Sequence, residues 1–108
     1  MLVSPSIASS NILNISEEVK FAVETCGQVH LDVEDGVVVS DISFGMKMCK
    51  RIKSISNDAY ISVHLEVYRP ETYIEELKEI IGGHSHTIPE EPAIVNAEKL
   101  FDAIRKVI

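Results

Sequence analysis

Apolar residues follow two patterns along this chain, one with the period of a strand and one with the period of a helix. Short runs rich in apolar residues predict strands at residues 2–7, 29–33 and 59–65, and the run at 84–88, which is polar for a buried position, is a fourth strand candidate. After each run, apolar residues recur every three or four positions, which predicts helices at residues 16–26, 48–55, 70–81 and 96–108. Four strands alternating with four helices predict an α/β fold, with right-handed crossovers and a parallel sheet flanked by helices.

Residues that favour the ends of elements mark several of these boundaries. Asn14 and Glu17 have the spacing of a capping box at the start of the first helix, and Gly27 is its expected stop. Pro70 opens the third helix, where the missing N–H of proline is tolerated. Pro5 predicts that the first strand lies near a sheet edge or ends there, because proline cannot donate to a ladder.

Size and charge narrow the class of protein. The 108 residues are enough for one domain with a modest core, so we expect a single domain over 1–108. The net charge of -7, from 10 Lys+Arg against 17 Asp+Glu, argues against nucleic acids and membranes as partners, because phosphate-rich surfaces are bound by clustered cations. No signal segment and no bilayer-length apolar run is found, which predicts a cytoplasmic protein.

The two cysteines, Cys26 and Cys49, lie far apart and form no C-x-x-C motif. Each falls on the apolar side of a predicted helix. We therefore expect reduced, buried thiols rather than a redox or metal site.

Potential metal ligands lie on two of the predicted strands. In the run V-H-L-D-V, alternation of side chains puts His30 and Asp32 on the same face of the strand. The run Y-I-S-V-H-L-E-V carries one histidine, His64, which is the natural third ligand. Neutral imidazole and carboxylate both suit zinc and other divalent transition metals. The sequence therefore predicts a metal site formed by these three residues.

Five motifs resemble the ribulose-phosphate 3-epimerase family. They are P-S-I-A-S-S-N at 5–11, H-L-D-V-E-D-G at 30–36, I-S-F-G at 42–45, V-H-L-E at 63–66 and R-P-E-T-Y-I-E-E at 69–76. The likeness extends from about residue 4 to residue 91. It implies a TIM-type (β/α)₈ barrel, of which this chain supplies about four of the eight strand-helix units, the N-terminal half.

The resemblance also implies a reaction and roles for individual residues. The family interconverts ribulose 5-phosphate and xylulose 5-phosphate by metal-assisted proton transfer at carbon 3. His30, Asp32 and His64 would hold the divalent cation, which is zinc, iron, manganese or cobalt. Asp32 would also transfer a proton, and Ser6 and His64 would contact the sugar phosphate.

The chain departs from the family pattern at several positions. Glu34 and Glu66 replace two methionines expected beside the metal, as solvated carboxylates or as additional metal ligands. The second catalytic aspartate and the phosphate-binding loops would belong to the other half of the barrel. Two alternatives to an active epimerase therefore remain, a truncated, inactive protein that only binds metal or sugar phosphate, and a non-functional fragment.

Half of a barrel has two open sheet edges and a face without helices. The open edges would expose N–H and C=O groups, and the helix-free face is expected to expose apolar side chains. We therefore expect a homo-oligomer or association with a complementary half-barrel.

Overall fold

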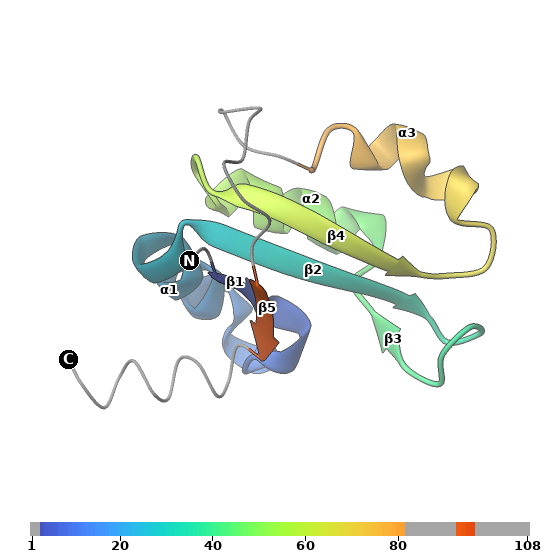
Figure 1. The fold of residues 1–108 in the computed structure, drawn as a ribbon, viewed down its shortest axis with the longest axis horizontal. Coiled ribbons are helices and arrows are strands. Elements are labelled where there is room, and N and C mark those ends of the chain that lie inside the picture. Colours follow the sequence, from blue (N-terminus) through green and yellow to red (C-terminus); the bar gives the residue numbers. More distant parts are fainter. Residues whose placement is uncertain (1–2, 82–92, 97–108) are drawn as a thin grey trace.

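The computed structural model of the chain describes residues 3–81 and the backbone of residues 93–96. Its strands are β1 (Val3–Ser6), β2 (Gln28–Asp35), β3 (Ile42–Ser43), β4 (Tyr60–Glu66) and β5 (Ala93–Asn96). Its helices are α1 (Ile15–Cys26), α2 (Met46–Ile55) and α3 (Ile74–Leu77), with 3₁₀ turns at Ile7–Ser9, Ile12–Asn14 and Pro70–Tyr73. The predicted α/β class is confirmed (Figure 1).

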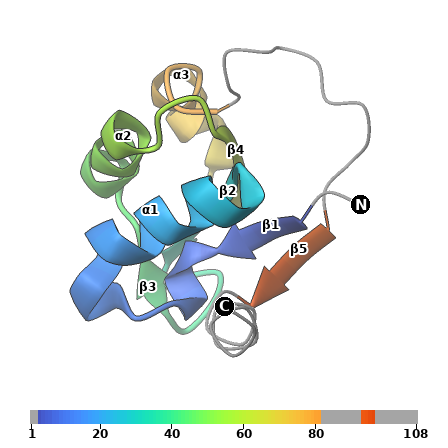
Figure 2. The ribbon, with the colours of Figure 1, turned by 90° about the vertical axis from the view of Figure 1, so that its left-hand side faces the viewer.

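The strands form one open sheet with β2 at its centre. β1 and β4 flank β2 and run parallel to it, and β5 runs parallel to β1 on the far side. β3 pairs antiparallel with the end of β2, because the 36–41 segment folds back as a hairpin, so the sheet is mixed rather than purely parallel. Figure 2 shows α1 and α2 together on one side of the strands. This open, half-covered sheet is consistent with half of a barrel.

The strand β5 was not predicted, and it changes the position of β1. Its ladder with β1 runs from Val3↔Ala93 to Ser6↔Asn96. β1 therefore lies between two strands, so Pro5 is not at a sheet edge; it lies next to Ser6, the end of the strand, which is the other position predicted for it. The register between β1 and β2 is set by Ser6 and His30, next to Pro5, which has no N–H to donate. The predicted strand at 84–88 and the last helix, beyond Asn96, lie outside the described residues.

The apolar core lies between the sheet and the two longer helices. Val29, Leu31 and Val33 of β2 are buried and point to the same face, as alternation requires. They belong to one cluster with Val19 and Ala22 of α1 and with Cys49 and Ile52 of α2. Burying each of the larger of these side chains stabilises the folded state by about 1.5–3 kcal/mol relative to leaving it exposed. The even-numbered residues of β2 consequently face away from the helices.

Local sequence signals describe some helix ends and fail at others. Gly27 ends α1 with φ +64°, as predicted. The capping box is wrong, since Asn14 makes no side-chain cap and a 3₁₀ turn capped by Asn11 leads straight into α1. The third helix is shorter than predicted: a 3₁₀ turn precedes α3, and tight bonds such as Ile80 N–H to Leu77 O follow it. In the described part of the chain, no helix has the length and apolarity needed to cross a membrane.

The two cysteines are free and differ in environment. Cys49 is buried, and that burial raises the pKa of its thiol to about 11. Its thiol is therefore protonated at neutral pH and has the inert character predicted for it. Cys26, at the end of α1, is only partly buried, because its helix reaches past the edge of the core before Gly27 turns the chain.

Candidate functional site

The face of the sheet that points away from α1 and α2 is polar. The ladder between β2 and β4 sets these side chains opposite one another in four pairs, Gln28↔Tyr60, His30↔Ser62, Asp32↔His64 and Glu34↔Glu66. The last residue of β1, Ser6, lies opposite His30 on the other side. The expectation of an apolar helix-free face is thus wrong for the described strands, because the alternation that buries valine and leucine against the helices turns polar residues outward.

Asp32 is the centre of this polar face. Its Oδ2 accepts a hydrogen bond of 2.5 Å from Ser6 Oγ, and its Oδ1 lies 3.3 Å from His30 Nε2 and 3.4 Å from His64 Nδ1. The pKa of Asp32 is lowered, and the hydrogen bond from His30 is the largest cause. Burial acts in the opposite direction and raises the pKa, but the hydrogen bond from Ser6 and the charges of both histidines lower it further. Asp32 is therefore an ionised carboxylate at neutral pH, available as a base or a ligand.

The two histidines beside Asp32 differ in exposure. His30 is 4% exposed, and its Nδ1 lies 2.7 Å from Ser62 Oγ, so both ring nitrogens have partners. The side chain of His64 is 58% exposed, and its Nδ1 also lies 3.5 Å from Glu66 Oε1. His30 is consequently held rigidly in the sheet, whereas His64 borders solvent.

The donor set fits a divalent cation. Asp32, His64 and Glu66 each offer one ligand atom, and these three atoms all lie within 4.8 Å of one another. Mixed imidazole and carboxylate donors suit zinc and other divalent transition metals. The structure thus brings Asp32 and His64 together, as expected, and adds Glu66. His30, the third predicted ligand, is not a member of this group. It could offer Nε2, which lies 3.3 Å from Asp32 Oδ1, if its Nδ1–H donates to Ser62.

Glu66 is not among the three ligands that the sequence predicts; the sequence leaves it as a solvated carboxylate or an additional metal ligand. The signal for it was the alternation that puts positions 64 and 66 on one face of β4. Glu34 occupies the equivalent place on β2, yet its Oε1 lies 3.2 Å from the hydroxyl of Ser43 in β3. Sequence alone did not distinguish these two glutamates, because the difference comes from the hairpin that carries Ser43.

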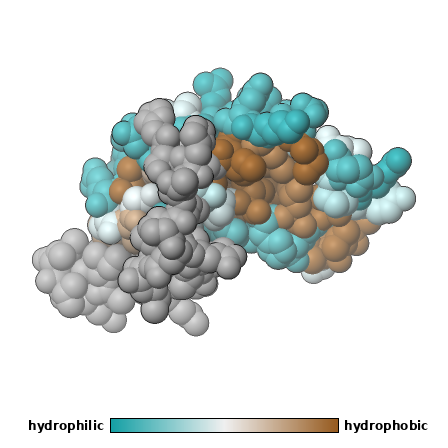
Figure 3. Space-filling model, turned by 45° about the horizontal axis from the view of Figure 1, so that its top comes forward, coloured by the Kyte–Doolittle hydropathy of each residue, from teal (hydrophilic) through white to brown (hydrophobic). Residues whose placement is uncertain are grey.

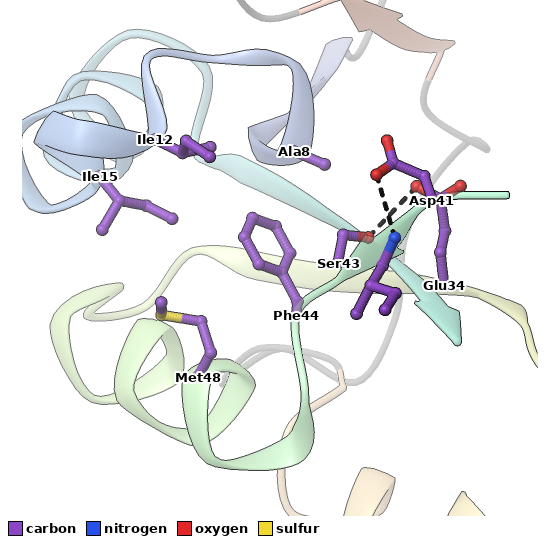
Figure 4. A pocket seen from close by; sticks show the side chains of 9 residues that line it. Ala8, Ile12, Ile15, Glu34, Asp41, Ser43, Phe44 and Met48 are labelled. Atoms are coloured by element: carbon purple, nitrogen blue, oxygen red, sulfur yellow. Dashed lines mark hydrogen bonds between the residues drawn. The ribbon is translucent and has the colours of Figure 1, made fainter. Parts of the chain in front are cut away.

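A cavity of about 320 Å³ lies by the hairpin (Figure 4), and Asp32, His64 and Glu66 are not among its described lining residues. Its walls come from the turns after β1, the hairpin and the start of α2, with apolar side chains such as Ile12, Ile15, Phe44 and Met48. Glu34, Asp41 and Ser43 give it one polar side, and no cationic residue is among its described lining residues. Its mainly apolar, acidic lining makes it unsuited to a phosphate group.

Asp35 ties together the loops at the carboxyl ends of β2 and β4. One oxygen accepts from Val37 N–H at 2.8 Å and Val38 N–H at 3.0 Å, and the other accepts from Tyr68 N–H at 2.6 Å. The bond from Tyr68, followed by those from Val38 and Val37, lowers the pKa of Asp35 below its ordinary 3.8. This carboxylate therefore supports the loop next to the candidate site.

Asp35→Asn should change how the free energy of unfolding depends on pH. A carboxyl whose pKa is lower in the folded state stabilises the fold above its unfolded pKa, and that contribution is lost as pH falls through the folded value. We expect Asp35→Asn to be less stable than the wild type from neutral pH down to about 4, and the gap to close at lower pH. Urea unfolding between pH 3 and 7 measures this, and a gap that stays constant would contradict it.

The fold and the site together define a class of protein, a partial (β/α) barrel with a candidate metal site near the carboxyl ends of its strands. The chain matches the ribulose-phosphate 3 epimerase family over residues 2–107. Because that match covers nearly the whole chain, this protein belongs to the ribulose-phosphate 3-epimerase family.

Curated relatives carry the same name. A ribulose-phosphate 3-epimerase of Synechocystis sp. is 35% identical over 78 residues, which cover 70% of this chain and 33% of the relative. One of Chlamydia muridarum is 28% identical over 107 residues, covering 98% of this chain and 46% of the relative. The chloroplastic ribulose-5-phosphate-3-epimerase of Arabidopsis thaliana is 36% identical over 78 residues, 70% of this chain and 27% of the relative. The chain spans less than half the length of these relatives.

Proposed function

We propose that this chain carries one half of an epimerase active site that interconverts ribulose 5-phosphate and xylulose 5-phosphate at carbon 3. The observation that carries the proposal is the ionised carboxylate of Asp32, held between Ser6, His30 and His64 on the polar face of the sheet. Family membership supports the choice of substrate. A cytoplasmic location stays a prediction of the sequence.

In the proposed reaction Asp32 takes the proton from carbon 3 of the substrate. Its low pKa makes it a weak base, so the substrate carbon must be made more acidic for the transfer to proceed. His64 is exposed enough to contact the sugar phosphate directly. The hydroxyl of Ser6 donates a hydrogen bond to Asp32. It would have to break that bond before it could donate to the substrate.

The cofactor we propose is a divalent cation held by His30, Asp32 and His64, with zinc, iron, manganese and cobalt as the candidates. When bound, such an ion polarises the oxygens next to carbon 3 and stabilises the enediolate charge. The buried His30 and its contact to Ser62 keep one imidazole oriented toward Asp32. The ligands are therefore preorganised by the ladder between β2 and β4.

Epimerisation also needs a second proton donor on the opposite side of carbon 3, and we propose that a second barrel half supplies it. That half is either a second copy of this chain or a complementary half-barrel. In the described residues β4 pairs only with β2, so its other edge is open. Figure 3 shows an apolar patch bordered by hydrophilic side chains on the side that carries β4 and α3. Separately, Ile74 of α3 is 46% exposed and Ile81, which follows α3, is 50% exposed. The open edge and the apolar patch support a partner at this edge.

The test is conversion of D-ribulose 5-phosphate by the purified chain, with mass measured in parallel by light scattering. We expect turnover with added zinc, manganese or cobalt, its loss on chelation, and its return when the ion is restored. Turnover should be found in the fractions that contain dimers or larger oligomers. A folded, metal-loaded oligomer without turnover would contradict an active site completed by a second copy of this chain and favour the alternative, a family member that binds metal only.

A further inference from the structure

Glu66 lies at the end of β4, beside His64 and close to Asp32. Its Oε1 is 3.5 Å from His64 Nδ1, and its ligand atom lies within 4.8 Å of those of Asp32 and His64. Its side chain is 32% exposed and belongs to the last residue of β4, so a hydrated ion can reach it. The short spacing on one strand means that little chain entropy is lost when both side chains bind one ion.

The charge balance of this group favours a cation. Two carboxylates, Asp32 and Glu66, approach the same imidazole nitrogen, His64 Nδ1, at 3.4 and 3.5 Å. Like charges this close repel each other, and a divalent ion between them would remove that repulsion. Together with imidazole they form an oxygen and nitrogen donor set that manganese, iron, cobalt and zinc accept.

Glu34 provides an internal comparison, because it is the cross-strand neighbour of Glu66 in the same ladder. Its carboxylate oxygen is 3.2 Å from the hydroxyl of Ser43, and it is not a member of the group formed by Asp32, His64 and Glu66. Two glutamates that lie opposite each other on neighbouring strands thus have different surroundings. Position alone therefore does not make a glutamate a ligand here.

We propose that Glu66 is a direct ligand of the divalent cation and binds it together with Asp32 and His64, two of the three ligands proposed above, from two adjacent strands. This inference rests on the proposed function in one respect only, because it concerns the same metal site. It adds a ligand from this chain to the proposed ligands His30, Asp32 and His64. The 108-residue chain then binds the ion without a partner.

Cobalt binding to the full 108-residue chain tests this without substrate. Calorimetry gives the dissociation constant, and the visible absorption of Co²⁺ reports its ligands. We expect one ion per wild-type chain, and Glu66→Gln to raise the dissociation constant at least about tenfold and shift the absorption bands. The matched variant Glu34→Gln removes the same charge from the neighbouring strand, and it should change affinity by no more than about threefold and leave the bands in place.

Three outcomes would overturn the inference: no cobalt bound by the wild type, equal losses in both variants, or unchanged bands in Glu66→Gln. Glu66→Asp keeps a carboxylate and should recover part of the affinity, which a merely structural role would not predict. Circular dichroism without metal checks that each variant is folded. Cobalt binding that depends on Glu66 in a chain without turnover would contradict the proposed function alone, and turnover with Glu66-independent binding would contradict this inference alone.

Discussion

Asp32→Asn is expected to lower kcat/KM for D-ribulose 5-phosphate by about 10²- to 10⁴-fold, the range that a positioned general base contributes. The amide keeps the shape of the side chain and its place among Ser6, His30 and His64, but it cannot take a proton. It is also a poor ligand, so affinity for the metal should fall as well. Assays over a range of metal concentration separate the two effects, because saturating metal restores binding but not proton transfer.

Exchange with solvent gives a second measure of the same step. In heavy water the wild-type chain should introduce deuterium at carbon 3, and Asp32→Asn should not. Asp58→Asn is the matched control, since Asp58 is exposed and precedes the opposite end of β4. Equal rates of deuterium uptake in the wild type and Asp32→Asn would show that another group removes the proton.

Leu31→Ala should remove a large share of the stability of the fold. Leu31 is fully buried in β2, in the one cluster that joins the sheet to α1 and α2. Truncating such a leucine costs about 2–5 kcal/mol, from lost burial and from the cavity left behind. Whole domains are stable by only about 5–15 kcal/mol, and small ones lie near the lower limit. The urea midpoint should fall on the order of 2 M, or the chain should be unfolded without denaturant.

Leu13→Ala is the matched control for that experiment. Leu13 is 92% exposed in the turn before α1, so the same truncation removes almost no buried surface. Its effect should stay within about 0.5 kcal/mol. Similar midpoints for both variants would mean that the packing of β2 against the helices does not carry the stability of this chain.

Local patterns in the sequence were enough to predict the class of fold and to place two of the site residues on the same face of one strand. Alternation in V-H-L-D-V is a property of consecutive residues, so it predicted that His30 and Asp32 share a face and that Leu31 faces the core. Gly27 ended α1 as predicted because a left-handed residue is a local requirement. The same local signals failed where neighbouring turns compete, as with the 3₁₀ turn that precedes α1 and replaces the capping box.

The sequence by itself therefore determined the α/β class, the family motifs and the candidate residues His30, Asp32 and His64. Only the tertiary structure decided the pairing of β5 with β1, at opposite ends of the described chain, and the polar character of the helix-free face. It also distinguished Glu66, beside His64, from Glu34, beside Ser43. The physical reason is register: which alternating side chains meet depends on how strands distant in sequence align, and no local pattern encodes that alignment.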